Sequence, residues 1–314
     1  MKNSKLVVAA FAALSLTAGQ AIAQDEPEGG GEGEGMGGDP CAGGEMHEGD
    51  GMAATGDGTM MGDGAVDAAP ALITPTGKIA ISVGVGIGLS KDLAGKPIDI
   101  TPDIFYGVAP KLEIGLAHSG HALTGFWADS VPLGIIGTGV CVTGTDGGCA
   151  KVYNGPVGIL GRYSLVQGSV DVAADAGVII ASISDPFQVG VKLGVRGRKV
   201  SGKMSIGFAP NIYIGLTERD AGNKESLAIP VDLYFGVNDK IGVGLQTGIE
   251  GPLDGFGDNF VVPVTVGGVY SINDKMTAGL TFNLHRVAGG SPDGVDAPGA
   301  ADLRSLGLMF GWHN

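Results

Sequence analysis

One unit recurs along this chain: a polar turn that opens directly into a run of alternating apolar and small residues. Its clearest copy is residues 237–245, where Asn-Asp-Lys bends the chain and an apolar residue follows at every second position. Residues 271–280 repeat the unit, and residues 108–116 carry a looser copy. Asn and Asp favour turns, and period-two alternation is typical of a strand with one apolar face. The repetition therefore predicts hairpins whose sheet must close on itself or pair with another.

The alternation predicts twelve strands. Their expected ranges are 79–89, 98–108, 111–119, 156–166, 169–181, 187–196, 203–217, 227–237, 240–249, 260–271, 275–285 and 303–312. These ranges exceed the usual five or six residues of a strand, and about 9–11 residues are enough to cross a bilayer. Pro210 predicts a bulge or an edge-like defect in the seventh strand. Tight turns alternate with mostly longer loops, so both termini are expected on the periplasmic side.

The chain resembles bacterial outer-membrane β-barrel proteins of the porin-like superfamily over about residues 75–314. The resemblance rests on the Asn-Asp-Lys turns, the alternating strands and a last strand with Phe310 and Trp312, after which the chain continues to His313-Asn314. It implies an all-β fold, a transmembrane antiparallel up-and-down β-barrel of about 12 strands. The alternative is a secreted soluble β-sandwich or barrel. A soluble core needs bulky packing, whereas the second strand face here is largely Gly, Ala, Ser and Thr with scattered charge.

The first 73 residues differ from the rest in composition. Residues 1–23 match a secretory signal peptide, with two lysines, an apolar run and Ala21-Ile22-Ala23 before the expected cleavage site. Residues 24–73 form an acidic, Gly- and Met-rich segment that is predicted to be disordered. The barrel is expected to occupy residues 74–314, in the outer membrane of a bacterial cell. Residues 71–314 are nearly balanced in charge, so the net charge of −14 belongs mostly to the tail, and nucleic-acid binding is excluded.

The longest irregular stretch, residues 120–154, contains two of the three cysteines. Cys141 and Cys149 are eight residues apart in a Gly/Thr-rich loop of an exported chain, which favours a disulfide between them. Cys41 has no obvious partner. We expect residues 120–154 to form a surface loop held by this disulfide. Its apolar run at 133–142 is expected either to fold back into the barrel mouth or to cap a neighbouring loop.

Polar and charged residues collect on the strand face opposite the apolar one, and these are the candidate lumen-lining residues. They are Asp99, Asp103, Glu113, Arg162, Asp171, Asp175, Lys192, Arg196, Asp232, Gln246 and His285. One interpretation is a transverse field, with acidic and basic groups on different strands, that selects solutes in a channel. The other is a set of internal salt bridges and hydrogen bonds that fill a narrow lumen.

No catalytic or metal site is predicted. Some twelve-stranded outer-membrane barrels are phospholipases with a His, a Ser and an amide on the outer wall, but His285 is expected to face the lumen and no Ser has a nucleophile-like context. His118 and His121 lack the helical geometry that makes His-x-x-His spacing diagnostic. The Met-rich tail, with Cys41 and His47, has ligands suited to copper(I), although a low-complexity spacer is the favoured interpretation. No cofactor is expected.

The sequence thus predicts a non-enzymatic, porin-like channel for passive diffusion of small hydrophilic solutes. Its expected partners are outer-membrane lipid and those solutes, and no oligomeric state is predicted. The alternative is a non-conducting structural or surface-interaction barrel with a charge-filled lumen. Lumen width decides between these two functions, and the sequence does not define it.

Overall fold

The computed structural model describes residues 72–90, 95–127, 139–143, 153–183, 185–291, 298–300 and 302–314. The expected signal peptide and nearly all of the expected disordered segment lie outside this part of the chain, as do Cys41, His47 and Cys149. The expected boundary between tail and barrel falls at residues 73 and 74. Ile73 and Thr74 are both buried against the barrel, with 3% and 0% of their surface exposed.

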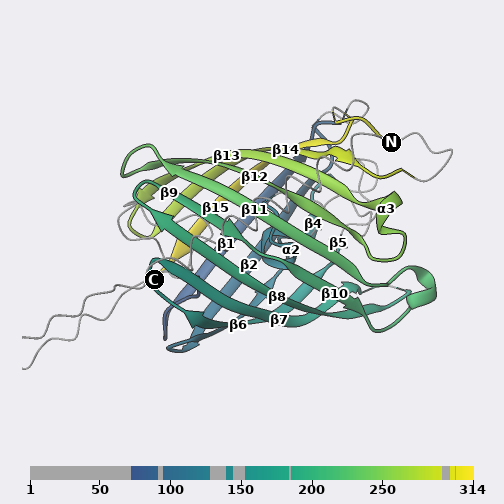
Figure 1. The fold of residues 1–314 in the computed structure, drawn as a ribbon, viewed down its shortest axis with the longest axis horizontal. Coiled ribbons are helices and arrows are strands. Elements are labelled where there is room, and N and C mark those ends of the chain that lie inside the picture. Colours follow the sequence, from purple (N-terminus) through teal and green to yellow (C-terminus); the bar gives the residue numbers. More distant parts are fainter. Residues whose placement is uncertain are drawn as a thin grey trace, which may run out of the picture. The chain divides into compact units, whose positions relative to one another are not determined.

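The described chain is almost entirely β-structure (Figure 1). Its strands are β1 (Ile79–Gly88), β2 (Ile98–Ala109), β3 (Leu112–Ala117), β4 (Gly139–Cys141), β5 (Tyr153–Asn154), β6 (Val157–Val166), β7 (Val170–Ser182), β8 (Gln188–Ser201), β9 (Met204–Phe208), β10 (Asn211–Gly215), β11 (Ser226–Gly236), β12 (Ile241–Pro252), β13 (Val261–Asn273), β14 (Met276–Gly289) and β15 (Arg304–His313). Three short helical turns accompany them: α2 (Gly120–Thr124), η2 (Arg219–Ala221) and α3 (Phe256–Asn259).

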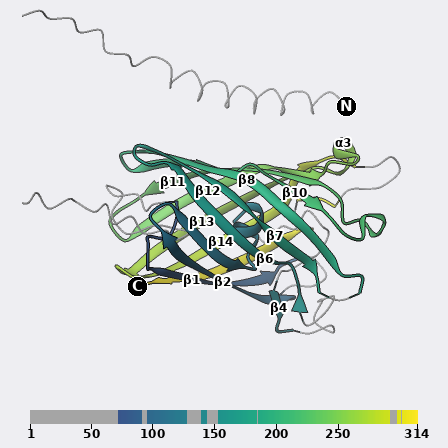
Figure 2. The same cartoon turned by 90° about the horizontal axis from the view of Figure 1, so that it is seen from below.

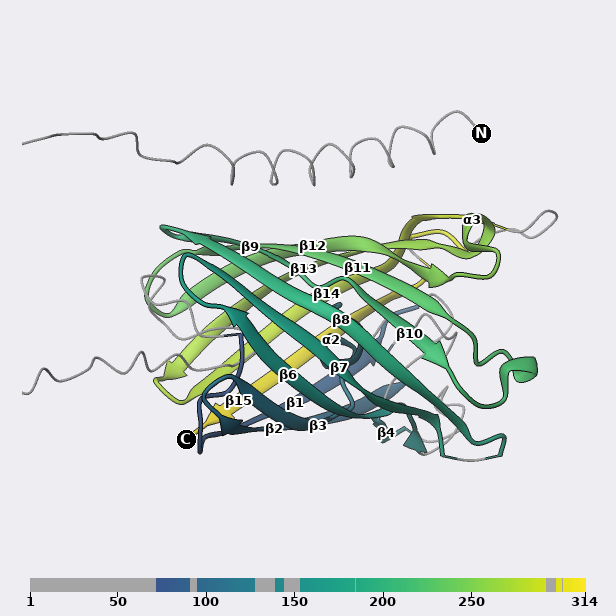
Figure 3. The same ribbon diagram turned by 60° about the horizontal axis from the view of Figure 1, so that its bottom comes forward.

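These strands form a closed antiparallel barrel with twelve strand positions around its circumference, which we call staves. Each strand pairs with its neighbours in chain order, and β1 pairs with both β2 and β15, which closes the sheet. β9 and β10 together make one stave, while β4 and β5 extend the sheet beside the start of β2. The tilt of the staves is visible in Figures 2 and 3. The predicted fold class and the twelve expected strands are confirmed.

The predicted defect at Pro210 is an interruption of the hydrogen bonding and not a bulge. Phe208 lies opposite Gly197 and Asn211 lies opposite Gly194, so both strands advance by the same number of residues. Proline has no N–H to donate, so the sheet hydrogen bonding is interrupted between β9 and β10 while the register is kept. β8 also continues five residues past Arg196, where the sixth strand was expected to end.

The outer face of the barrel is apolar. Along β12, Ile241, Val243 and Leu245 are 42–44% exposed and alternate with inward residues, and β15 exposes Leu308, Phe310 and Trp312 in the same way. A barrel leaves no open sheet edge, and a continuous apolar outer face suits hydrocarbon. Separately, no helix in the described ranges is long and apolar enough to cross a membrane.

The tight turns lie at one end of the barrel, together with the C-terminus. The side chains of Asn238 and Asn273 each accept a hydrogen bond from the backbone N–H of the residue two positions later, which explains why Asn recurs at the start of these turns. At this end the Ile79 N–H donates to Asn314 Oδ1 over 2.8 Å, so the last residue lies beside the start of β1. The longer connections, including α3, lie at the opposite end (Figure 1).

Candidate pore constriction

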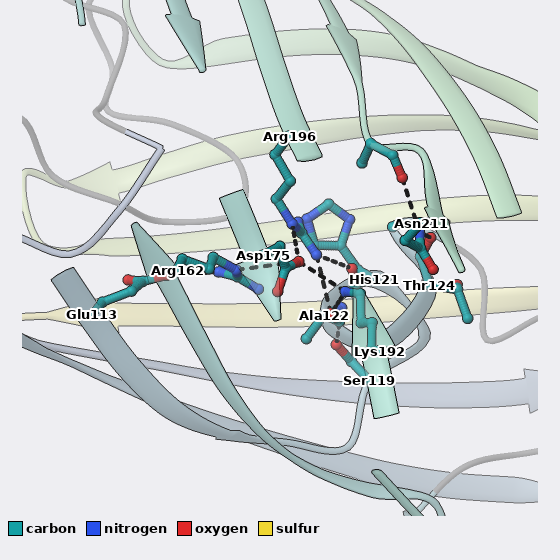
Figure 4. Close-up of polar contacts among 12 residues, drawn as sticks. Glu113, Ser119, His121, Ala122, Thr124, Arg162, Asp175, Lys192, Arg196 and Asn211 are labelled. Carbon is teal, nitrogen blue, oxygen red and sulfur yellow. Dashed lines mark hydrogen bonds and ion pairs between the residues drawn. The ribbon is translucent and has the colours of Figure 1, made fainter. Parts of the chain in front are cut away.

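Five of the predicted lumen residues form one continuous salt-bridge network, which we call the charge network: Glu113, Arg162, Asp175, Lys192 and Arg196 (Figure 4). Arg162 Nη1 lies 2.8 Å from Glu113 Oε1, and its Nε lies 3.7 Å from Asp175 Oδ2. Lys192 Nζ and Arg196 Nε bind the same Asp175 oxygen at 2.8 and 2.9 Å. Three cations therefore converge on one carboxylate oxygen.

Strand register explains how these five residues meet. Glu113 is directly opposite Arg162 across β3 and β6, and Arg162 is opposite Asp175 across β6 and β7. Asp175 is opposite Gly194 on β8, so Lys192 and Arg196 flank it two residues to either side on the same face. Directly opposed and diagonal positions are within reach of long side chains. All five side chains are at most 10% exposed, so their charges depend on each other for compensation.

Residues 118–127, here called the inner segment, cross the inside of the barrel and contain α2 (Figure 3). At their start, Asp103 of β2 accepts hydrogen bonds from the backbone N–H groups of His118 and Ser119 at 2.7 and 3.0 Å. Asp103 also accepts from the Ser119 hydroxyl at 2.5 Å, and that hydroxyl in turn caps α2 by accepting from the Ala122 N–H.

The carbonyl end of the inner segment is held by donors from three other strands. Lys192 Nζ and Arg196 Nη2 both donate to Ala122 O, at 2.9 and 3.0 Å. Asn211 of β10 donates to Thr124 O at 2.6 Å, and Gln246 of β12 donates to Gly125 O at 3.0 Å. The acidic group thus lies at the N-terminal end of α2 and the cations at its C-terminal carbonyls, which matches the direction of a helix dipole.

Glycines on the inner wall make room for the apolar side chains of this segment. A Cβ at Gly158 would lie 2.7 Å from Leu123, and one at Gly248 would lie 2.8 Å from the Phe126 ring. A Cβ at Gly244 would overlap the ring of Trp127. These glycines are inward positions of β6 and β12, so the alternating Gly residues of the sequence form the surface on which the inner segment packs.

A second segment, residues 72–77, enters the barrel from the end with the tight turns, and we call it the N-terminal strap. The Thr74 N–H donates to Glu113 Oε2 at 2.6 Å, which joins the strap to the charge network. Thr76 forms a parallel bridge with Gly107, where any Cβ would overlap the Pro75 carbonyl. The strap and the inner segment therefore occupy the lumen from two directions.

The wall formed by β13, β14, β15 and β1 is different. Its inward positions mostly carry small or neutral polar side chains, together with the apolar Val269 and Met309, and His285 and His313 are the ionisable groups among those the structure describes. Examples of these inward residues are Thr265, Gly267, Thr277, Gly279, Thr281, Asn283, Ser305, Gly307, Gly311, Ser82 and Gly84. The lumen therefore has a charged wall, covered by the inner segment, facing a small-residue wall.

The other predicted lumen residues lie apart from the charge network. Asp103 and Gln246 hold the inner segment, and Asp171 pairs with Arg198 at 2.9 Å. Asp99 lies against Gly86, and Asp232 lies against Gly207. Sequence reasoning missed Arg198 and Asn211. Both continue the inward alternation, Arg198 past the expected end of its strand and Asn211 directly after Pro210.

His285 has a serine partner that the sequence did not indicate. Its Nε2 lies 2.9 Å from the Ser305 hydroxyl, and the Asn283 amide donates to the same hydroxyl at 3.0 Å. From the sequence, no serine was expected in a nucleophile-like context, but the structure places Ser305 within hydrogen-bonding distance of His285. The pair faces the lumen, however, and the amide binds the serine instead of orienting the imidazole as the third member of a catalytic triad would.

His118 and His121 are both held within the inner segment. His118 Nδ1 lies 2.7 Å from Pro102 O, and its ring makes an edge contact with Tyr153. His121 contributes its backbone carbonyl to Arg196 at 3.0 Å. In the described ranges, no group of three or more His, Cys, Asp or Glu residues is arranged to hold a metal ion.

The expectation of a surface loop fails for residues 120–127, which pack inside the barrel. Residues 128–138, with most of the apolar run, lie outside the described chain. Cys141 is disulfide-bonded and pairs across the sheet with Asp99, while Cys149 lies outside the described residues. The Cys141–Cys149 pairing stays a prediction.

We expect mass spectrometry of unreduced peptides to recover Cys141 and Cys149 in one linked peptide pair, because a short loop in an oxidising compartment favours their pairing. Reduction should separate the two peptides and leave the mobility of the folded barrel on gels unchanged. Alkylation of both thiols in the purified, unreduced protein would contradict the pairing. A link from Cys141 to Cys41 would instead join the barrel to the tail.

The closed antiparallel barrel of twelve staves, apolar outside and charged within, has the architecture of a membrane-spanning β-barrel. No protein-family model and no curated protein matches the sequence.

Similar solved structures include a NanC porin, 8% identical, which aligns over 74% of this chain and 97% of its own with a TM-score of 0.48. A KdgM porin is 7% identical over 74% of this chain and 98% of its own, with a TM-score of 0.47. An outer membrane channel from Pseudomonas putida F1 is 10% identical over 76% and 96%, with a TM-score of 0.46. At this distance the likeness carries no residue role and no substrate to this chain.

Proposed function

We propose that this barrel is a channel for the passive diffusion of small hydrophilic solutes across the bacterial outer membrane, without an enzymatic step. The observation that supports it is the small-residue wall of β13, β14, β15 and β1, which faces the lumen with neutral polar groups and many glycines. Such a wall offers hydrogen bonds to a passing solute without strong binding. Outer-membrane lipid covers the apolar outer face, and residues 1–23 direct export and are then cleaved.

The inner segment would form the constriction of this channel. Asp103 on β2 binds the start of this segment, and the cations Lys192 and Arg196 on β8 bind carbonyls in its middle, so the field at the constriction runs between these two parts of the wall. A solute that passes beside α2 must cross this field, which favours dipolar or small charged molecules of suitable orientation. We therefore propose that the predicted transverse field acts at this constriction.

We expect the folded, detergent-purified barrel to conduct ions in planar bilayers and to allow small sugars into liposomes, with rates that fall as sugar size increases. Heat-modifiable gel mobility would verify folding before each measurement, and heat-unfolded protein is the control. A folded barrel that produces neither conductance nor liposome swelling would contradict the channel proposal.

The alternative function is a non-conducting structural or surface-interaction barrel. The observation that favours it is the occupation of the lumen by both the inner segment and the N-terminal strap, each hydrogen-bonded to inward side chains. The two functions separate when the inner segment is released by mutation. Conductance that appears only on release indicates a gated channel, whereas silence in both forms supports the structural function.

A further inference from the structure

Two buried cations of the charge network bind Asp175 and also donate to backbone carbonyls of α2. Lys192 Nζ and Arg196 Nη2 both donate to Ala122 O, and Arg196 Nη2 also donates to His121 O. A neutral carbonyl cannot neutralise either charge. Hydrogen bonds from these groups to an ionised oxygen are about twice as strong as neutral ones. The carbonyls of α2 thus occupy positions that suit the oxygens of an anion.

Within the charge network the cations outnumber the carboxylates by one. Its five side chains comprise three cations, Arg162, Lys192 and Arg196, and two carboxylates, while Asp103 acts on Arg162 from outside the network. A second observation points the same way. Arg162 is 7% exposed, yet its Nε and Nη2 have no hydrogen-bond partner within the described residues. A buried guanidinium N–H without a partner is costly, and a ligand oxygen would relieve that cost.

We propose that Arg162, Lys192 and Arg196 form a binding site for a small oxyanion, a carboxylate or a phosphate, that competes with the carbonyls of α2. Binding requires the carbonyl end of the inner segment to leave the cations, so the ligand stabilises a state in which the constriction is displaced. A ligand shifts such an equilibrium only by its differential affinity for the two states. The difference here is a charged oxygen against the neutral Ala122 O. This inference deepens the proposed channel function and rests on it for its consequence, the opening of the pore.

Trp127 provides a signal for this displacement that does not depend on transport. Its ring packs against Gly244 and its backbone N–H donates to Gln246, so it must move when the inner segment is released. The chain has two tryptophans, and the other, Trp312, faces outward on β15. A Trp312→Phe variant therefore reports on Trp127 alone.

The test titrates this variant, folded in detergent, with sodium phosphate and separately with sodium acetate, each at constant ionic strength maintained with sodium chloride. We expect a saturable change in Trp127 emission with at least one oxyanion and none with chloride alone. Whether phosphate, acetate or both produce it identifies the oxyanion class. An identical response to chloride, or no response to either oxyanion, would overturn the site.

Adding Arg162→Gln should weaken the oxyanion response roughly tenfold or more, because a charge-assisted hydrogen bond is lost while α2 keeps its own contacts. Arg198→Gln is the matched control, since Arg198 lies on the same face of β8 as Arg196 but pairs with Asp171. Equal weakening by both variants would show that general lumen charge, and not this site, binds the anion.

Bilayer conductance measured with the same anions distinguishes the oxyanion-site proposal from the channel proposal. A Trp127 response without conductance would support the oxyanion site and contradict the channel proposal. Conductance without a Trp127 response would support the channel and contradict the oxyanion site.

Discussion

Replacing Asp175 by asparagine is expected to lower the free energy of unfolding of the barrel by roughly 3–5 kcal/mol, the usual cost of removing one partner from a buried ion pair. Asp175 is 2% exposed on its side chain, and its Oδ2 is the single atom on which Lys192, Arg196 and Arg162 converge. Asparagine keeps the shape and one acceptor but removes the charge, so three cations remain against Glu113 alone. Denaturant unfolding of the refolded barrel in detergent would measure the loss.

Glu225→Gln is the matched control for this experiment. Glu225 also accepts from an arginine, Arg219, but this pair is exposed at the end of the barrel with the long loops. Water and salt screen such pairs, so the stability should remain nearly unchanged. If Asp175→Asn lowers the free energy of unfolding as little as Glu225→Gln does, then water in the lumen screens the charge network, and the network contributes little to the stability of the fold.

Replacing Gly244 by leucine is expected to raise the single-channel conductance several-fold. The new side chain would occupy the position of the Trp127 ring and push the end of the inner segment off β12, away from Gln246. The barrel itself should remain closed, because Gly244 pairs with Tyr234 through the backbone and that ladder is unaffected. Planar-bilayer recording of wild type and variant at the same salt concentration would measure the change.

Gly268→Leu provides the comparison for Gly244→Leu. Gly268 lies on β13 between the exposed Val266 and Tyr270, so its substituent points toward lipid, and the nearest atom to an added Cβ is a backbone oxygen at 3.5 Å. Its conductance should equal that of the wild type. A decrease in conductance for Gly244→Leu would mean that the inner segment stays in place and that the leucine narrows the remaining passage.

The sequence was sufficient to predict the barrel, because a sustained period of two indicates antiparallel strands with one apolar face. It was not sufficient to predict which charges meet. Arg162 and Asp175 become opposite only through a turn with an irregularity between Ser164 and Val166, where β6 advances two residues and β7 one, so that Leu165 and Val166 are both exposed. The period of two does not indicate where such an irregularity falls, so it does not indicate which inward residues become paired.

The inner segment was beyond prediction for a different reason. α2 has five residues, too few for a helical periodicity to be visible, and the side chains of the barrel wall that donate to the carbonyls of α2 and Gly125 lie 70 to 121 residues away in the chain. His285 and Ser305 illustrate the same limit, since they meet only because β14 and β15 are adjacent. Local sequence carries no information about such partners.

The seam between β1 and β15 joins the two ends of the barrel sequence. The hydrogen bond from the Ile79 N–H to Asn314 joins residues 235 positions apart, whereas the other staves pair with neighbours in chain order. Contacts of such long range form slowly, because the chain must lose much conformational entropy before the contact is gained. Until this ladder forms, β1 and β15 each have an open edge that is able to join the edge of a second molecule. Closure of this seam therefore removes the last open edges through which the chain could aggregate.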